Sequence, residues 1–303
     1  MYDIIIIGAG PAGLTASIYA RRANKKFLVI EANNYGGKII NTINIENYPG
    51  EPNISGFDFA NRLYNQAKDM GSEIVFEKVV DIKNNKDYKE VITKNNKYKS
   101  KTIIIATGSD NRKLGLANED DLVGKGISYC ATCDGAFYKN KDVAIIGGGD
   151  AAIEDAIYLS DIANKVYLIH RRDEFKAELS MIDKLKEKNN VEFILNSYVN
   201  NINATDKINS INVINNEDRK ETEFKIDGLF IAVGQIPENQ HFAKLINIDK
   251  TGYIEADETC HTNVEGIFVA GDTRTKQLRQ LVTATSDGAI AATEAIKYIN
   301  KLK

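Results

Sequence analysis

The fold of this chain follows from the stretch Tyr2-Asp3-Ile4-Ile5-Ile6-Ile7-Gly8-Ala9-Gly10-Pro11-Ala12-Gly13. The apolar run over residues 2–7 predicts a strand that is buried on both faces. The glycines then predict a tight turn into a helix over about residues 11–23. A second strand over residues 26–30 ends at Glu31, which completes a βαβ unit.

This unit predicts a dinucleotide site. Gly8 permits the turn, Gly10 lets a pyrophosphate approach the backbone, and Gly13 lets helix and strand pack closely. The helix that begins at Pro11-Ala12 offers free N–H groups and a partial positive charge. Glu31 would accept hydrogen bonds from a ribose diol and would repel a 2′-phosphate, as suits FAD or NAD. The alternative is that these glycines only shape the fold.

A second fingerprint lies in the middle of the chain. Gly147, Gly149 and Ala152 repeat the turn, with Asp150 between them. We expect a strand over residues 143–146, a helix over 151–163 and a strand over 165–170. That last strand ends in His170-Arg171-Arg172, with Lys176 one helical turn further on. Paired guanidiniums favour a 2′-phosphate, so NADPH is predicted rather than NADH; the alternative is a solvated basic patch.

Cys130 and Cys133 form a Cys-x-x-Cys pair ahead of the second fingerprint. Zinc is disfavoured because a structural site needs four ligands, and only Cys260 and three histidines are left over. The redox interpretation has one thiolate attack a partner disulfide while the other resolves the mixed disulfide. Asp134 is either a proton donor and acceptor for the thiols or an ordinary capping residue. Cys260 is expected to be a small half-buried residue.

The length and the net charge of the chain limit which class of protein it can be. A chain of 303 residues exceeds what one core usually serves, so two domains are expected. The net charge of -3 leaves no broad basic face, which makes nucleic acid an improbable partner. Residues 1–7 are too short for a membrane span and run into a glycine turn instead of a cleavage site, so we expect a cytoplasmic protein with no membrane association.

The remaining pattern predicts two copies of one layout. We expect a helix over 57–70, hairpin strands over 73–80 and 88–101, and a buried strand over 102–106 in the first copy. We expect a helix over 175–188, three short strands between 191 and 214 and a strand over 228–233 in the second. A strand over 266–270 and a helix over 280–300 lack a fingerprint of their own, so this tail is expected to fold back onto the first domain. The fold class is therefore α/β, with two Rossmann-like three-layer dinucleotide-binding domains, the second inserted into the first; the expected parts are 1–113, 114–240 and 241–303.

Several motifs in order resemble those of low-molecular-weight, bacterial-type thioredoxin reductases over essentially the whole chain. They are Gly8-Ala9-Gly10-Pro11-Ala12-Gly13-Leu14-Thr15-Ala16, Glu46-Asn47-Tyr48-Pro49-Gly50, Ile104-Ile105-Ala106-Thr107-Gly108, Cys130-Ala131-Thr132-Cys133-Asp134-Gly135, His170-Arg171-Arg172-Asp173, Phe268-Val269-Ala270-Gly271-Asp272 and Arg279-Gln280. The position of the Cys130 to Asp134 motif is highly specific for this family.

The resemblance implies FAD in the discontinuous domain, NADPH in the middle domain, a thioredoxin or thioredoxin-like partner and a homodimer. It implies that Cys133 faces the flavin, that Cys130 attacks the thioredoxin disulfide and that Asp134 is the general acid. The residues expected to hold FAD are Gly8, Gly10, Pro11, Ala12, Gly13, Glu31, Gly36, Gly37, Lys38, Asn47, Ala106, Gly108, Gly271, Asp272, Arg279 and Gln280. Those expected to hold NADPH are Gly147, Gly149, Asp150, Ala152, His170, Arg171, Arg172, Lys176 and Gly234. No metal is expected.

Three positions depart from the family pattern. Lys176 replaces a usual Arg, and Gln235 replaces a common His. Lys38 replaces a usual Gln and is expected to place positive charge near the FAD and to favour its reduced anion. The predicted reaction passes electrons from NADPH through FAD and the dithiol to thioredoxin. The rivals with the same fold have NADH or ferredoxin as donor, or another dithiol protein as acceptor. The rivals from another class are a flavin-binding redox sensor without enzymatic activity and a zinc-binding interaction module.

Overall fold

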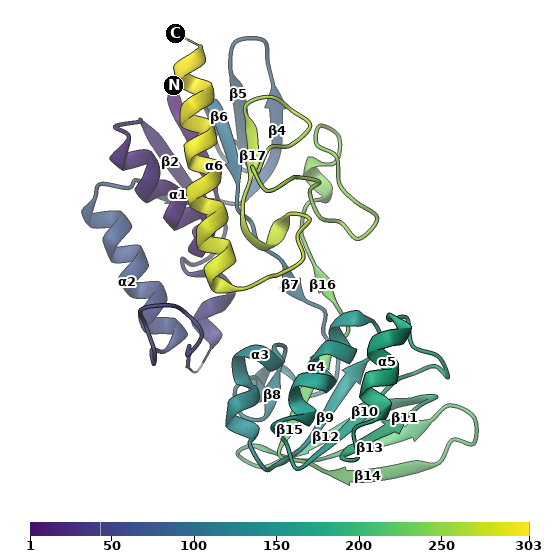
Figure 1. The fold of residues 1–303 in the computed structure, drawn as a ribbon. Helices are drawn as coiled ribbons and strands as arrows, with labels where there is room; N and C mark the ends of the chain where they lie inside the picture. The colour runs from purple at the N-terminus through teal and green to yellow at the C-terminus, as the bar shows by residue number, and fades with distance from the viewer. Residues whose placement is uncertain (43, 303) are drawn as a thin grey trace. The chain divides into compact units, whose positions relative to one another are not determined.

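The computed structural model describes residues 1–42 and 44–302, and it divides the chain into two compact units (Figure 1). Unit 1 comprises Met1–Asp110 and Ile236–Lys303, and unit 2 comprises Asn111–Gln235. The chain crosses between the units in two short strands, β7 (Asp110–Asn111) and β16 (Gln235–Ile236), which pair with each other. Unit 2 is thus inserted into unit 1, and the predicted α/β class with two Rossmann-like domains is confirmed.

Unit 1 is built on a seven-stranded sheet with the order β3-β2-β1-β6-β5-β4, in which β17 also pairs with β6. Its strands are β1 (Tyr2–Ile7), β2 (Phe27–Glu31), β3 (Ile74–Phe76), β4 (Val79–Asn84), β5 (Lys89–Thr93), β6 (Lys97–Ile105) and β17 (Ile267–Val269). Strands β1, β2, β3, β6 and β17 are parallel, so their carboxyl ends meet at one edge. That edge carries the first glycine turn.

The predicted hairpin was wrong in where its last strand begins and ends, because β6 spans Lys97–Ile105. It runs unbroken past residue 101, where a break between two strands was predicted, and the chain turns earlier, where Asn96 N donates to Thr93 Oγ1 at 2.9 Å. Its first residues pair antiparallel with β5, and its last residues pair parallel with β17. Strand β3 pairs parallel with β2 instead of entering the hairpin, so β4, β5 and β6 form the antiparallel meander.

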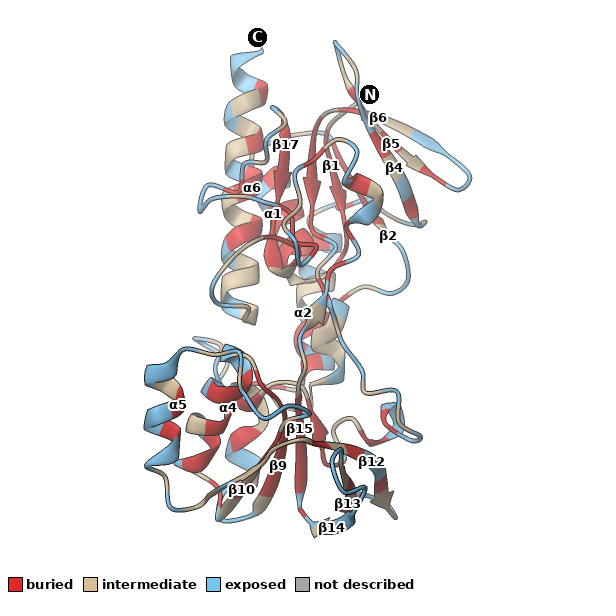
Figure 2. Cartoon of the chain, turned by 90° about the vertical axis from the view of Figure 1, so that its right-hand side faces the viewer, coloured by how far each residue is buried: buried red, intermediate tan, exposed pale blue. Residues whose placement is uncertain are grey.

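Three helices, α1 (Pro11–Arg22), α2 (Gly56–Asp69) and α6 (Leu281–Lys301), pack on one face of this sheet. The meander and a segment around residues 242–256 cover the other face. Figure 2 shows the buried central strands between these layers. Helices α1 and α6 approach closely because Gly288 has no side chain; a Cβ there would collide with the carbonyl oxygen of Ala12.

Unit 2 repeats the layout with a five-stranded parallel sheet of order β11-β10-β9-β15-β8. Its strands are β8 (Ile127–Ser128), β9 (Asp142–Gly147), β10 (Lys165–Ile169), β11 (Val191–Ile194) and β15 (Gly228–Ala232). Helices α3 (Ala131–Asp134), α4 (Asp150–Ser160) and α5 (Leu179–Lys186) pack on one face. An antiparallel sheet of β12 (Ser197–Ala204), β13 (Ile208–Asn215) and β14 (Glu221–Lys225) covers the other. Short 3-10 helices span Gly37–Asn41, Asp120–Leu122, Gly135–Tyr138, Gln240–Phe242 and Gly271–Thr273.

One prediction for unit 2 was wrong, and one strand was missed. The helix expected from residue 175 begins only at Leu179, because residues 171–178 fold back over the second glycine turn. Lys176 N donates to Gly148 O at 2.6 Å, and that bond is incompatible with a helix at this point. Strand β14 was not predicted because its sequence is largely charged and its residues are mostly exposed. Within the described residues, no helix is both long and apolar enough to cross a bilayer.

Candidate functional site

The first glycine turn joins β1 to α1 and leaves no room for side chains at two of its three glycines. A Cβ on Gly8, whose φ is +109°, would collide with the carbonyl of Ala106 at the end of β6, and one on Gly13 would collide with the carbonyl of Gly8. At Gly10 the nearest atom to an added Cβ is 3.9 Å away, on Gly37. The backbone at Gly10 is therefore open to a ligand at the start of α1, as a pyrophosphate site requires.

Glu31 ends β2 and is held against this turn. Its Oε2 accepts a hydrogen bond from Ala9 N at 2.7 Å, and its Oε1 accepts one from Asn33 N at 2.9 Å. Both carboxylate oxygens are thereby oriented by backbone donors. Each oxygen keeps further acceptor capacity, which suits contact with ribose hydroxyls.

Gly36 and Gly37 bring a second loop onto the glycine turn. Gly36 N donates to Ala9 O at 2.8 Å, and Gly37 has a φ of +63° and lies against Gly10. Lys38 follows and is half-buried, with its Nζ 3.5 Å from Ser109 Oγ. Burial lowers the pKa of Lys38, and the negative charges of Asp272 and Asp110 oppose that shift.

Gly271 and Asp272 follow β17 and lie beside α1. Gly271 has a φ of +79°, and a Cβ there would come within 2.9 Å of Ala12 Cβ. Asp272 Oδ1 is a buried atom with no hydrogen-bond partner among the described residues. Burial raises the pKa of Asp272, and Lys38, Lys276 and Arg279 oppose that shift. A buried carboxylate oxygen without a donor is costly in a protein interior, so this atom fits one that contacts a ligand hydroxyl.

The Gly271 turn is fixed by a buried ionic network that the sequence analysis missed. Asp287 on α6 accepts from Gly271 N, Arg274 Nε and Lys276 Nζ, each at 2.9 Å, and Arg274 reaches its second oxygen as well. Burial raises the pKa of Asp287, but the bonds from Arg274 and Lys276 outweigh it and hold that pKa below its usual value. The sequence signal that could have indicated this network is Asp287 itself, an acid beside Gly288 within a stretch of small residues.

Arg279 and Gln280 complete this side of unit 1. The guanidinium of Arg279 lies 3.9 Å from the ring centroid of Tyr253 and donates to Arg274 O at 3.2 Å, but its Nε is buried without a described partner. Gln280 Oε1 accepts from Asn47 Nδ2 at 3.1 Å. Gly108, with a φ of +71°, has nothing within 4 Å of an added Cβ.

All the predicted FAD residues therefore belong to unit 1, on the loops that follow β1, β2, β6 and β17. Two orphaned buried atoms, Asp272 Oδ1 and Arg279 Nε, and the open backbone at Gly10 fit a dinucleotide that carries a flavin.

The second glycine turn, between β9 and α4, repeats these features. An added Cβ on Gly147 would lie 2.5 Å from both Ala152 Cβ and Ala232 O, whereas one on Gly149 would meet nothing closer than 3.8 Å. The ring of His170 packs directly over Gly148, where a Cβ would collide with it. The backbone at Gly149 is again the open position, which fits a second dinucleotide.

A basic cluster surrounds the end of β10. Arg171, Arg172 and Lys176 are exposed, and none forms an ion pair with a residue in 1–42 or 44–302. Lys176 reaches the cluster because its backbone bridges to Gly149, not through a helical turn as predicted. His170 Nε2 donates to Glu174 O at 3.1 Å. Burial lowers the pKa of His170, with Arg171 and Arg172 adding to the effect and the backbone hydrogen bond to Glu174 opposing it.

Two other predicted residues frame this turn. Asp150 Oδ1 accepts from Glu178 N at 2.9 Å and so ties the start of α4 to the start of α5. Gly234 has a φ of +102° and an open Cβ position, and its carbonyl accepts from Arg112 N at 3.0 Å, next to the crossing between the units.

The dithiol lies in the same unit, at α3. Cys130 and Cys133 are joined in a disulfide with their Cα atoms 5.3 Å apart. Ser128, at the end of β8, donates from Oγ to Asp134 Oδ2 at 2.6 Å and accepts from Cys130 N at 3.1 Å. Burial raises the pKa of Asp134, and the Ser128 bond only partly offsets the shift. The structure thus places a carboxyl group that holds its proton to higher pH than usual next to the redox pair, and Ser128 is a further residue that sequence reasoning missed.

Cys260 belongs to unit 1. It is fully buried with a φ of +64°, and its Sγ is 3.8 Å from Asp287 O. Burial raises the pKa of its thiol to about 12, so it stays protonated and packs as a small residue.

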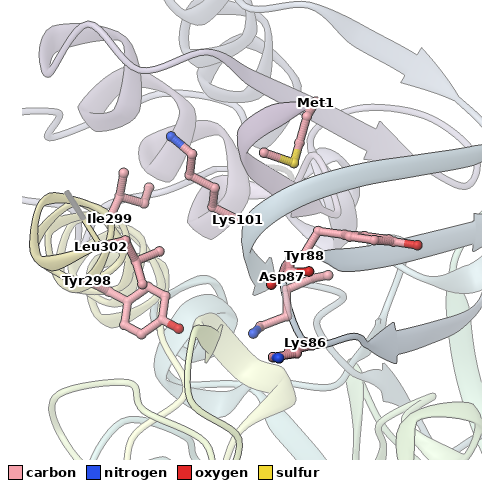
Figure 3. A pocket seen from close by; sticks show the side chains of 9 residues that line it. Met1, Lys86, Asp87, Tyr88, Lys101, Tyr298, Ile299 and Leu302 are labelled. Atoms are coloured by element: carbon pink, nitrogen blue, oxygen red, sulfur yellow. The ribbon is translucent and has the colours of Figure 1, made fainter.

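A cavity of about 340 Å³ opens in unit 1, but no predicted site residue lines it (Figure 3). Its walls include Met1, Tyr88 and Tyr298. Met1 precedes β1 and Tyr298 is near the end of α6, so the cavity lies at the edge of the sheet opposite the glycine turn. It is not part of the dinucleotide site.

Comparison with known proteins agrees with this geometry. The family model described as pyridine nucleotide-disulphide oxidoreductase matches residues 2–288. A thioredoxin reductase of Listeria innocua is 44% identical over 304 residues, covering 100% of this chain and 95% of that protein. The crystal structure of thioredoxin reductase from Streptococcus pyogenes matches with a TM-score of 0.94 at 41% identity, covering 99% of each chain. A ferredoxin-flavin thioredoxin reductase from Clostridium acetobutylicum matches with a TM-score of 0.55 at 32% identity, covering 99% of this chain and 98% of that one.

Two glycine turns of the same construction and a disulfide beside a protonatable carboxyl group lie in a chain whose relatives match it from end to end. This chain belongs to the pyridine nucleotide-disulphide oxidoreductase family and, within it, to the thioredoxin reductases.

Proposed function

We propose that this protein passes electrons from NADPH through FAD and the Cys130–Cys133 disulfide to the disulfide of a thioredoxin or thioredoxin-like protein. The observation that carries the proposal is the disulfide at α3, held in the same unit as the second glycine turn and beside Asp134. A flavin-binding sensor without enzymatic activity would need neither the disulfide nor a second dinucleotide site.

FAD belongs to unit 1 in this proposal and supplies a two-electron relay between the nicotinamide and the disulfide. Gly10 and the start of α1 hold the pyrophosphate, and Glu31 accepts the hydroxyls of the adenosine ribose. Asp272 accepts from the ribityl region through its unpartnered Oδ1, and Arg279 donates to the cofactor from its Nε. The other predicted unit 1 residues shape the loops around them.

NADPH belongs to unit 2. Gly149 and the start of α4 hold its pyrophosphate, and Arg171, Arg172 and Lys176 bind the 2′-phosphate. Lys176 contributes a point charge because it lacks the planar fork of an arginine.

The dithiol then carries out two exchanges. Reduction of the disulfide leaves one cysteine as a thiol and the other as a thiolate. The Cys130 thiolate attacks a sulfur of the thioredoxin disulfide. A mixed disulfide forms and a thioredoxin thiolate leaves, and Asp134 supplies the proton that this thiolate takes up. Cys133 then gives its proton back to the Asp134 carboxylate and attacks the Cys130 sulfur. The bond between Cys130 and thioredoxin breaks, the second thioredoxin sulfur leaves as a thiolate, and the internal disulfide reforms.

Stopped-flow reduction of the flavin under anaerobic conditions tests the proposal. NADPH should bleach the flavin faster than NADH, and substitution of both Arg171 and Arg172 by Gln should remove that preference. Lys184→Gln, an exposed lysine on α5, serves as the control. Protein that lacks flavin after reconstitution, or that leaves oxidised thioredoxin unreduced with every pyridine nucleotide, would contradict the proposal.

Ferredoxin is the second candidate donor, because the Clostridium acetobutylicum relative carries it in its name. The open backbone at Gly149 and the three exposed cations beside it favour a pyridine nucleotide here. If reduced ferredoxin drives thioredoxin reduction while NADPH leaves the flavin oxidised, the donor in this proposal is wrong.

The proposal includes a homodimer in the cytoplasm, as the family resemblance implies. Sedimentation analysis of the FAD-loaded protein tests the homodimer, and fractionation of cells tests the cytoplasmic location.

A further inference from the structure

The residues around Asp272 carry more positive than negative charge. The buried and half-buried cations are Lys38, Arg274, Lys276 and Arg279, and the carboxylates among them are Asp272 and Asp287. Asp110 and Glu258 also act on this group, but both are exposed, so water and salt screen them. A group of four buried or half-buried cations and two carboxylates favours an occupant that is negatively charged.

Two of the four cations are already paired with a buried carboxylate. Arg274 and Lys276 both donate to Asp287 at 2.9 Å. Arg279 lies over the ring of Tyr253. Lys38 differs: its Nζ has a long contact of 3.5 Å to Ser109 Oγ, and it forms no ion pair with any residue in the described part of the chain. Lys38 and Arg279 are therefore the two cations that remain for the negative charge of a ligand, and Lys38 is the one whose charge is localised on a single nitrogen.

The side chain of Lys38 reaches the loop that follows β6. The preceding residue, Gly37, lies against Gly10 on the glycine turn, whereas the Nζ of Lys38 reaches Ser109, which follows β6. The groups that act on Lys38 electrostatically, Asp272 and Arg279, follow β17. The pyrophosphate is served by the N–H groups at the start of α1, so Lys38 faces another part of the cofactor.

We propose that Lys38 holds the negative charge that the flavin acquires when it is reduced, and so sets the midpoint potential of the bound cofactor. This inference rests on the proposed FAD site. Transfer of a hydride from the nicotinamide adds two electrons and one proton to a neutral flavin, which leaves one negative charge. Transfer of two electrons and that proton to the disulfide gives one thiol and one thiolate, and the charge leaves the flavin. A nearby cation therefore stabilises the reduced state and not the oxidised one.

Three variants of the FAD-loaded protein test the proposal: Lys38→Gln, Lys38→Met and Lys38→Arg. The midpoint potential is measured anaerobically against a reference dye, and FAD content and affinity are measured alongside. We expect the Gln and Met variants to bind FAD and to show a reduced-to-oxidised ratio about tenfold lower at the same ambient potential, which is about 30 mV for a two-electron couple. The Arg variant should keep the wild-type potential, and Lys250→Gln, an exposed lysine of unit 1, is the control.

The pH dependence of the potential separates an electrostatic role from a structural one. An anionic reduced flavin takes up one proton for two electrons, so the midpoint potential falls by about 30 mV for each tenfold decrease in proton concentration. Where the reduced flavin is neutral, the midpoint potential falls twice as steeply. In Lys38→Gln the change from the steeper to the shallower slope should move to higher pH.

Unchanged potential and slope in Lys38→Gln and Lys38→Met would overturn the inference. Weaker FAD binding at an unchanged potential would also overturn it, since the cation would then serve the pyrophosphate. Failure of wild-type protein to take up FAD would instead contradict the proposed function, so the two failures are distinguishable.

Discussion

Asp134 is the residue whose protonation matters most to the proposed reaction. Its pKa is raised by burial, and Ser128 donates to the carboxyl group in either protonation state. Asp134→Asn keeps an oxygen that can accept from Ser128 but cannot supply a proton. We expect thioredoxin reduction to fall by roughly 10² to 10⁴-fold, the usual range for a general acid. Flavin reduction by NADPH should be unchanged, and stopped-flow measurement of both half-reactions separates them.

Asp134→Asn lowers activity, but it should raise the stability of the protein relative to wild type as the pH increases. The pKa of this carboxyl group is higher in the folded protein than in the unfolded chain, where it has the ordinary value of an aspartate. Between those two values the folded protein keeps a proton that the unfolded chain has lost, so the free energy of unfolding of the wild type falls as pH rises through this window. Asp134→Asn does not titrate, so its stability relative to wild type should increase as the pH rises through this window. Urea denaturation across this pH range measures it, and a constant difference would contradict the assignment.

The two cysteines should differ in a trapping experiment. Cys130→Ser and Cys133→Ser should both abolish steady turnover, because the internal disulfide can no longer form. Only Cys133→Ser keeps the thiol that is proposed to attack thioredoxin. With a thioredoxin whose single remaining cysteine carries an aryl disulfide, Cys133→Ser should accumulate the protein mixed disulfide and Cys130→Ser should not. Non-reducing electrophoresis shows the product, and the reverse pattern would exchange the two roles.

Residues that act through tertiary contacts were outside the reach of the sequence. The glycines, Glu31 and the cysteine pair could be predicted because their chemistry depends on spacing along the chain. Ser128 bonds Asp134 from a neighbouring strand end, and Arg274 and Asp287 meet across a loop and a helix. No local pattern indicates which hydroxyl or which acid lies opposite a given group. Their roles therefore became visible only in the folded chain.

At the scale of elements, α6 carries the acid that fixes the Gly271 turn. Asp287→Asn removes the charge that Arg274 and Lys276 share in a buried position, and both cations remain. Loss of one partner from a buried ionic group typically costs about 3–5 kcal/mol. We expect a lower melting temperature and weaker FAD retention. Glu294→Gln on the same helix, which weakens surface pairs with Lys297 and His261, should cost at most about 1 kcal/mol.

Elements with strong periodicity were predicted well, and those fixed by pairing were not. The predictions for β1, α1, β2 and α6 are confirmed to within a residue or two, because an apolar run or an amphipathic repeat defines each. The start of α5 was wrong because residues before Leu179 have helical spacing but bind the glycine turn instead. Strand β14 has no apolar alternation, and only its pairing with β13 makes it a strand.

At the scale of the whole molecule, the repeated glycine turn made the duplication visible. The insertion followed from one further observation, that the last strand and helix lack a fingerprint. The structure bears this out, since β17 pairs with β6 of the first segment and α6 packs on α1. Where the chain crosses between the units depends on the pairing of β7 with β16, two strands too short to recognise from sequence. The predicted boundaries at residues 113 and 240 accordingly differ by a few residues from those of the units.

The insertion leads to a prediction about motion. The proposed nicotinamide site and the disulfide belong to unit 2, and both must reach one flavin in unit 1, while Cys130 must also reach a protein substrate. One fixed arrangement can hardly satisfy these contacts, and the two crossings at β7 and β16 allow unit 2 to turn as a body. We expect a bifunctional lysine reagent that joins the units to abolish steady turnover.

The cross-linked fraction is identified by mass spectrometry, and a monofunctional reagent of the same chemistry is the control. A locked population should still complete one half-reaction in a single turnover, either reduction of the flavin by NADPH or its oxidation by the disulfide, according to the pose that was trapped. Both half-reactions at wild-type rates in a fully cross-linked sample would mean that one arrangement of the units serves both steps, and the hinge would have no part in the reaction.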